Sequence, residues 1–180
     1  WETLPAPIAA GNVPRLDRSK FLALPSPSPL IRIKFLFATG SANDPAGKEG
    51  LMLLTASMIA DAGSEELRTE EISRALFPLA GSFGAQVDKV MVTFTAVIHR
   101  DNLDKFARIF LPQLLSPGGR VEDFSRIQEM QNNELVQDLC NDNEESLGKE
   151  RLVANIIART GYAVTALGSR AGLEGRKSTR

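Results

Sequence analysis

The sequence predicts an α+β domain in which helices pack on one face of a mixed or antiparallel sheet. Three observations support this fold class. A strand pattern of period two occupies residues 30–38, a hairpin pattern follows at 82–98, and helical patterns lie between and after them. Strands with helices between and after them form layered domains of this kind. We find no internal repeat within the 180 residues.

The first strand and the first helix are marked by alternation and by a capping pair. Ile31, Ile33 and Phe35 alternate with polar or smaller residues, which is typical of a half-buried strand. Asp44-Pro45 combines a capping carboxylate with a proline suited to a first helical turn. We therefore expect an apolar helix over residues 45–61, ended by the glycine at 63.

The next segments predict a short helix and a hairpin. Thr69 is expected to cap a helix that carries Glu70 and Glu71 in its first turn and ends near residues 78–81. The β-branched and aromatic run at 90–98 then predicts the second arm of a hairpin whose first arm covers residues 82–86.

Three more helices complete the expected domain. The first begins at a capping Asp101 and ends at the Ser-Pro-Gly-Gly of residues 116–119, and the others cover residues 121–139 and 144–158. Residues 1–29 contain six of the ten prolines and predict an extended arm. Residues 30–168 then form a single domain, either complete or truncated, and the basic residues 169–180 form a flexible tail.

The composition excludes several classes of protein. Apolar residues make up 43% and charged residues 24%, as in soluble globular proteins, and the net charge of −1 gives no basic surface for nucleic acid. The sequence contains no run of about 18 apolar residues, so it predicts no membrane-spanning helix. The single cysteine, Cys140, cannot form an internal disulfide, and His99 is the only histidine. No signal peptide is visible, and the compartment stays open.

The segment GSANDPAGKEGLMLLTASM at residues 40–58 resembles the opening of the pitrilysin/insulinase family of zinc peptidases, which includes the mitochondrial processing peptidases. The later segments follow that family's order: AGSFGA at 80–85, the strand at 90–98, and Pro117 with the residues 122–124. The resemblance covers roughly residues 30–173. It implies the α+β architecture of one insulinase-type domain.

The resemblance also implies a zinc site that this chain has lost. Family members carry His-x-x-Glu-His on the first helix, and these positions fall on Leu53, Ala56 and Ser57. The downstream glutamate ligand falls on Glu134, while the accompanying acidic position falls on Ile127. Since zinc needs three protein ligands and a water, we expect no cofactor on this chain and zinc only in a catalytic partner.

Three other features have a structural and a functional interpretation. In the family, the glycine-rich strand is the edge on which a substrate peptide adds, and here it would comprise Gly81, Ser82, Phe83, Gly84 and Ala85. The alternative is a plain hairpin. Glu134 is either a retained metal-ligand position or a glutamate on the helix surface. His99 is either a functional residue or a solvated loop histidine.

The expected function is that of a non-catalytic homologue of an insulinase-type metallopeptidase. Such a chain would pair with a zinc-bearing homologue, or with itself, to form a chamber that holds peptides. The alternative is a stand-alone structural or peptide-binding assembly module. An active metallopeptidase with an atypical site would need ligands drawn from Glu134, Glu129, Asp138, His99 or residues 141–145, whose spacing fits no known pattern.

Overall fold

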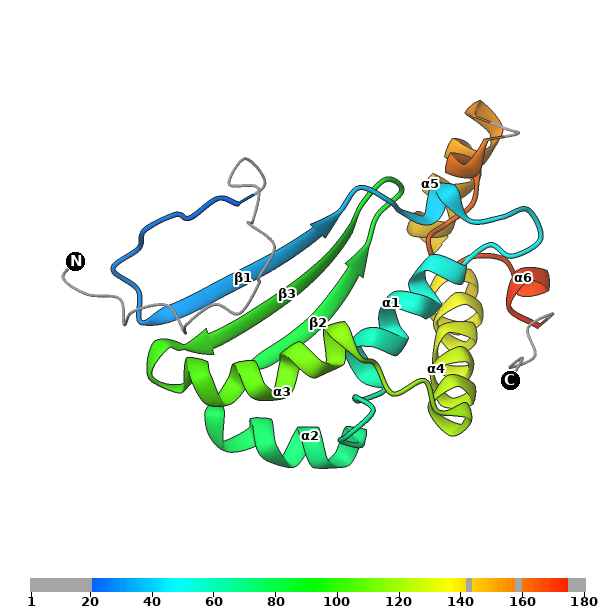
Figure 1. Cartoon of the computed structure of the whole chain (residues 1–180). Helices are drawn as coiled ribbons and strands as arrows, with labels where there is room; N and C mark the ends of the chain where they lie inside the picture. Colours follow the sequence, from blue (N-terminus) through cyan, green and yellow to red (C-terminus); the bar gives the residue numbers. More distant parts are fainter. Residues whose placement is uncertain (1–20, 142–143, 158–159, 175–180) are drawn as a thin grey trace.

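The computed structural model describes residues 21–141, 144–157 and 160–174 of the chain. Its sheet has three strands, β1 (Leu30–Phe37), β2 (Ser82–Val87) and β3 (Val92–His99), in the order β1-β3-β2. Both pairings are antiparallel. Helices cover one face of this sheet (Figure 1). The predicted α+β class is therefore confirmed.

Six α-helices accompany the sheet in the described residues. They are α1 (Leu51–Asp61), α2 (Thr69–Leu76), α3 (Leu103–Leu115), α4 (Val121–Asn133), α5 (Glu144–Ile156) and α6 (Arg170–Glu174). Short 3-10 segments are η2 (Ser41–Asn43), η3 (Phe77–Leu79), η4 (Arg100–Asn102) and η6 (Gly161–Ala163), and η5 (Glu134–Asn141) is a π-helix. No helix in the described residues is both long and apolar enough to span a bilayer.

The strand register decides which side chains reach the core. Ile33 pairs with Ala96 and Phe35 with Phe94, and β2 places Phe83 opposite Ala96 from the other side. Side chains of directly paired residues point to the same face of a sheet. These apolar residues therefore all lie on the face that α1 and α3 cover.

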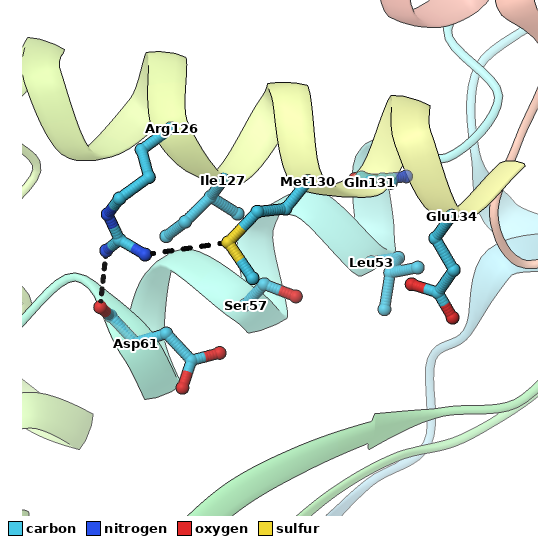
Figure 2. A pocket seen from close by; sticks show the side chains of 8 residues that line it. All are labelled: Leu53, Ser57, Asp61, Arg126, Ile127, Met130, Gln131 and Glu134. Carbon is cyan, nitrogen blue, oxygen red and sulfur yellow. Dashed lines mark hydrogen bonds between the residues drawn. The ribbon is translucent and has the colours of Figure 1, made fainter. Parts of the chain in front are cut away.

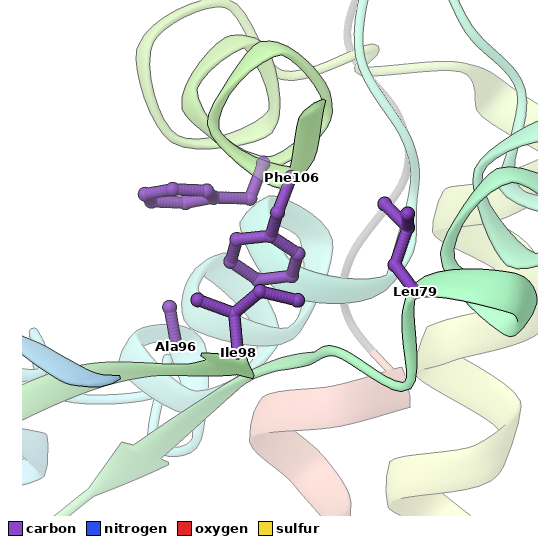
Figure 3. Packing of buried hydrophobic residues seen from close by; sticks show 5 residues of the cluster. Leu79, Ala96, Ile98 and Phe106 are labelled. Carbon is purple, nitrogen blue, oxygen red and sulfur yellow. The ribbon is translucent and has the colours of Figure 1, made fainter. Parts of the chain in front are cut away.

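The core is built on that face. Phe106 and Phe110 of α3 pack against Ala96 and Ile98 of β3, with Leu79 closing the cluster (Figure 3). The Phe106 and Phe110 rings are 4.9 Å apart between centroids, and Phe106 is fully buried. This packing holds α3 to the middle strand.

The first helix begins six residues later than the sequence predicts. Gly47 and Gly50 have φ angles of +76° and +89°, so the chain between Pro45 and Gly50 turns before it can become helical. The Asp44 carboxylate still caps the helix, because it accepts hydrogen bonds from the backbone N–H groups of Gly50 (2.7 Å) and Met52 (2.8 Å). Thus the predicted cap is present, although the predicted boundary is wrong.

Two other predicted caps differ. Thr69 is the first residue of α2, and its hydroxyl donates to the Asp61 carbonyl oxygen at the end of α1 (3.1 Å). The backbone N–H of Arg68 instead donates to the Glu71 carboxylate (2.8 Å). Asp101 lies in η4, one short turn before α3 begins.

The helix predicted over 121–139 changes geometry at Glu134. α4 ends at Asn133, and η5 continues the chain as a π-helix to Asn141. π-helices are rare, and they frequently occur at functional sites. Glu134, the ligand-type position of the family resemblance, is thus the first residue of the widened segment.

The start of the expected C-terminal tail is folded. Residues 170–174 form α6, where Leu173 is 1% exposed, and its carbonyl oxygen accepts a hydrogen bond from the Gln128 side chain (2.5 Å). The segment fits because Gly168 and Gly172 approach the backbone of Glu49 too closely for any side chain. Residues 175–180 lie outside the described part, as do residues 1–20 of the expected arm; residues 21–29 are exposed and form neither helix nor strand.

Candidate functional site

A cavity of about 190 Å³ lies between α1 and the helix formed by α4 and the start of η5. Figure 2 shows its two walls, with α1 below and α4 above. α1 contributes three lining residues and the facing helix five. The lining residues are Leu53, Ser57, Asp61, Arg126, Ile127, Met130, Gln131 and Glu134.

Helical spacing explains why these side chains meet. Leu53, Ser57 and Asp61 are four residues apart and therefore follow one face of α1. Ile127 and Glu134 are seven residues apart, two helical turns, and follow one face of the opposite wall. The cavity therefore brings together Leu53, Ser57 and Glu134, three of the four positions that the family resemblance assigns to zinc chemistry.

Ala56, the fourth position, does not line the cavity. It is 2% exposed and packs with Val92 and Phe94 of β3 on the sheet-facing side of α1. The general-base position of the resemblance thus points into the core, whereas the two ligand positions of the same helix face α4. Ile127 is also buried, at 4% exposed, and contacts Leu54 and Ala62.

The donor groups present do not fit a zinc ion. Leu53 has no lone pair and Ser57 offers only a neutral hydroxyl, so among the three resemblance positions only Glu134 supplies a carboxylate. The other lining carboxylate, Asp61, lies beside Arg126. A catalytic zinc site has three protein ligands in addition to water. Within the described residues, no group of three or more histidine, cysteine, aspartate or glutamate side chains is placed to hold a metal. The three resemblance positions that line this cavity thus offer one carboxylate, one hydroxyl and no imidazole.

Charged groups gather at the end of the cavity formed by Asp61 and Arg126. The Arg126 guanidinium donates to the Asp61 carbonyl oxygen (2.9 Å) and to the Asp123 carboxylate (3.1 Å), as Figure 2 shows for the first of these bonds. Partial burial raises the pKa of the Asp61 carboxyl, and the Arg126 charge opposes that rise. Neither residue is predicted as a site residue from the sequence, although Asp61 lies four residues after Ser57 on the same helical face.

Gln131 ties three distant segments together beside the cavity. Its side-chain nitrogen donates to the carbonyl oxygens of Gly50 (3.0 Å) and Leu167 (2.8 Å). The side-chain oxygen is buried and has no hydrogen-bond partner among the described residues. The residue thereby fixes the start of α1 against α4 and against the segment that leads to α6.

The predicted peptide edge is β2, an outer strand of the sheet. No described strand pairs with its outer side, since β3 alone is its neighbour. Ser82 is exposed, and a side chain at Gly84 would meet nothing within 4 Å. Gly81 has a different role, because a side chain there would lie 2.7 Å from Ile98 and Phe106 in the core. Phe83 and Ala85 also pack toward the core.

His99 lies away from the cavity. Its side chain accepts a hydrogen bond from the Asp101 backbone N–H (3.3 Å) and is 3.4 Å from the Asp101 carboxylate. It therefore stabilises the turn into η4 and is not one of the residues that line the cavity. The side chain of Cys140 lies outside the described residues.

Comparison with solved structures finds chains of similar fold. The structure is similar to the peptidase M16 inactive domain from Pseudomonas fluorescens, with a TM-score of 0.72 and 20% identity over 83% of this chain. It is similar to a protease from Helicobacter pylori, with a TM-score of 0.69 and 16% identity over 84% of this chain. The fold is that of a peptidase M16 domain.

Pitrilysin shares this M16 fold, with a TM-score of 0.66 and 18% identity over 80% of this chain. The chain spans 36% of each of the first two proteins and 15% of pitrilysin. No protein-family profile matches the sequence, and comparison with curated proteins finds no match. The likeness is therefore one of three-dimensional structure, and it establishes the fold.

Proposed function

We propose that this chain is a non-catalytic M16-type domain that pairs with a zinc-bearing homologue and forms one wall of a peptide-holding chamber. The observation that carries the proposal is the cavity between α1 and α4. Its walls bring Leu53, Ser57 and Glu134 together as the family resemblance requires, yet the first two side chains cannot bind zinc.

The pattern of retention and loss supports a binding role. Residues that build the fold are in place, including the Asp44 cap of α1 and the close approach of Gly81 to the core. Residues that would perform hydrolysis are replaced by apolar or neutral ones. A domain of this kind contributes surface and leaves the zinc chemistry to its partner. One structural neighbour is itself described as an inactive M16 domain, which agrees with this proposal.

The β2 edge is the surface that we assign to peptide. Its outer side is unpaired among the described strands, and Gly84 leaves room for a backbone to approach. An extended peptide would add as a further strand through main-chain hydrogen bonds, a mode that needs no metal.

Affinity purification of the tagged chain from its native cell tests the pairing. We expect a co-purifying protein with a His-x-x-Glu-His segment, zinc in the eluate, and peptidase activity that neither chain shows alone. Removal of the partner's zinc with a chelator should abolish the activity and leave the pair intact. A chain that purifies without partner, zinc or activity would contradict the pairing and support the stand-alone assembly module.

A further inference from the structure

The edge of the sheet opposite β2 has a charge pattern that the proposed function does not use. β1 is the other outer strand, and no strand of the described residues pairs with its outer side. It lies at the margin of the sheet farthest from β2 (Figure 1). An unpaired strand of eight residues presents a row of N–H and C=O groups that can accept another strand, and at its start the N–H of Leu30 donates to the Ser28 hydroxyl (3.1 Å).

The side chains along this edge alternate in character. Ile31, Ile33 and Phe35 point to the core, so Arg32 and Lys34 lie on the opposite, helix-free face. Both cations are exposed, and neither has an ion pair among the described residues. The three strands contain no aspartate or glutamate, so nothing within the sheet neutralises this charge.

Exposed apolar side chains flank the two cations. Leu30 is 54% exposed and Leu36 is 60% exposed, and alternation places both on the face of Arg32 and Lys34. Charges alone on an edge strand commonly prevent unwanted pairing. Leucines left exposed on either side of them increase the apolar surface of the edge, which favours a partner that covers them.

We propose that the outer edge of β1 binds an extended acidic segment of a partner protein, which adds to the sheet as a further strand. In an antiparallel arrangement, the residues opposite Leu36, Lys34, Arg32 and Leu30 follow one another at every second position. The segment therefore reads apolar-x-acidic-x-acidic-x-apolar. A second copy of β1 would instead place cations opposite cations, which destabilises a strand pair.

The proposal extends beyond the function assigned above, because the two surfaces are opposite edges of the sheet. Titration of the isotope-labelled full chain with synthetic peptides, followed by amide NMR, distinguishes them. The acidic probe is Val-Thr-Glu-Thr-Glu-Thr-Val, and two comparison peptides carry glutamine or lysine in place of glutamate. We expect amide shifts in residues 30–37, and binding of the acidic peptide about 2- to 30-fold tighter than that of the glutamine peptide.

Charge reversal provides the sharpest variant. Arg32→Glu with Lys34→Glu should abolish the preference for the acidic peptide and create one for the lysine peptide, a gain that a misfolded chain could not show. The control Arg74→Glu with Lys105→Glu changes the net charge equally on exposed residues of α2 and α3, and should bind as the wild type does. A probe with proline at its central position should bind weakly, because proline lacks the N–H needed for strand pairing.

Three results would overturn the proposal. Equal affinity for the acidic and glutamine peptides would show that Arg32 and Lys34 recognise nothing. Shifts confined to residues 82–87 would place the peptide on β2, which supports the proposed function and contradicts this inference. Absence of binding to every peptide up to millimolar concentration would show that the β1 edge takes no such strand.

Discussion

The side-chain amide of Gln131 donates a hydrogen bond to the carbonyl oxygen of Gly50, across 81 residues of sequence. The same nitrogen also donates to Leu167, so one buried side chain joins the first turn of α1, the α4 helix and the C-terminal segment. These bonds define one end of the cavity between α1 and α4. They make Gln131 a structural residue of the candidate site.

Replacement of Gln131 by leucine should destabilise the fold by about 1–3 kcal/mol, because the carbonyl oxygen of Leu167 loses its side-chain donor and that of Gly50 keeps only the backbone N–H of Leu54. Chemical denaturation followed by circular dichroism measures the change. Gln86→Leu, at an exposed position of β2, is the control and should change the free energy of unfolding by less than about 0.5 kcal/mol. Equal effects of the two substitutions would show that the Gln131 bonds contribute nothing to stability.

Two substitutions should restore zinc binding. Leu53→His with Ser57→His places two imidazoles one helical turn apart on the wall that faces Glu134, as the His-x-x-Glu-His motif requires. We expect about one zinc ion per chain by elemental analysis and none in the wild type. Adding Glu134→Ala should lower the zinc affinity at least about tenfold. If the double variant bound no zinc, the assignment of these positions would be wrong.

The general-base position is expected to behave differently. Ala56→Glu places a carboxyl group without a partner among Val92 and Phe94. The fold should lose about 3 kcal/mol of stability if this carboxyl is protonated, and more if it is charged. Ser57→Glu, on the cavity wall one residue later, is the matched control and should be tolerated better. Thermal unfolding of the two variants compares the costs. Similar melting temperatures would contradict the orientation of α1.

Asp61 should make the fold less stable at neutral pH than at acid pH. Asp61 is an exposed residue, and partial shielding of its carboxyl raises the folded pKa, so its small contribution is fully present below the unfolded value of about 3.9 and is lost as the pH rises through the folded pKa. Asp61→Asn should therefore stabilise the fold at pH 7 relative to the wild type, and the gain should disappear near pH 3. Removing a negative charge from the end of α1 acts in the same direction.

Asp104→Asn is the control for this pH dependence. Asp104 is exposed in the first turn of α3, where a carboxylate interacts favourably with the helix dipole. Its replacement should slightly destabilise the fold at pH 7. Denaturation midpoints of both variants, measured between pH 3 and pH 8, give the direction of each stability change. A change in the same direction for both variants at pH 7 would contradict the account of Asp61.

Two glycines of the β2 region should respond in opposite ways to alanine. Gly81→Ala places a methyl group 2.7 Å from Ile98 and Phe106, and overpacking of this kind costs about 1–3 kcal/mol. Gly84→Ala meets no atom within 4 Å and should leave stability unchanged or slightly raised. Urea denaturation compares them. A larger loss at Gly84 would refute the placement of β2.

The β2 variants also separate stability from peptide binding. Gly84→Ala keeps the fold but adds a side chain where a peptide backbone would approach, so peptide affinity at β2 should fall while the melting temperature holds. Peptide affinity measured for wild type and Gly84→Ala, with shifts mapped to residues 82–87, gives the comparison. Unchanged affinity would argue for the plain hairpin.

Elements that depend on local pattern are predictable from the sequence alone. Alternation in Ile31, Ile33 and Phe35 predicted the first strand, and the structure confirms it as β1. The β-branched and aromatic run at residues 90–98 similarly predicts β3, which in the structure begins at Val92. Such patterns are readable because periods of 2.0 and 3.6 residues are properties of the backbone itself.

Boundaries and partners were decided by tertiary contacts. The start of α1 depends on how the Asp44 carboxylate reaches Gly50 and Met52 over a turn made possible by left-handed glycines. The folding of α6 depends on Leu173 finding a buried position and a bond from Gln128. Neither contact leaves a periodic signal, because each joins residues that local spacing does not relate.

The candidate site shows the same division. Helical spacing places Leu53 and Ser57 on one face of α1, and the resemblance pointed to Glu134. Only the packing of α1 between the sheet and α4 decided that Ala56 faces the core, and that Arg126 and Asp61 join the cavity. The periodicity of a helix fixes which side chains share a face, whereas the neighbours of that face are fixed by what the rest of the chain packs against it.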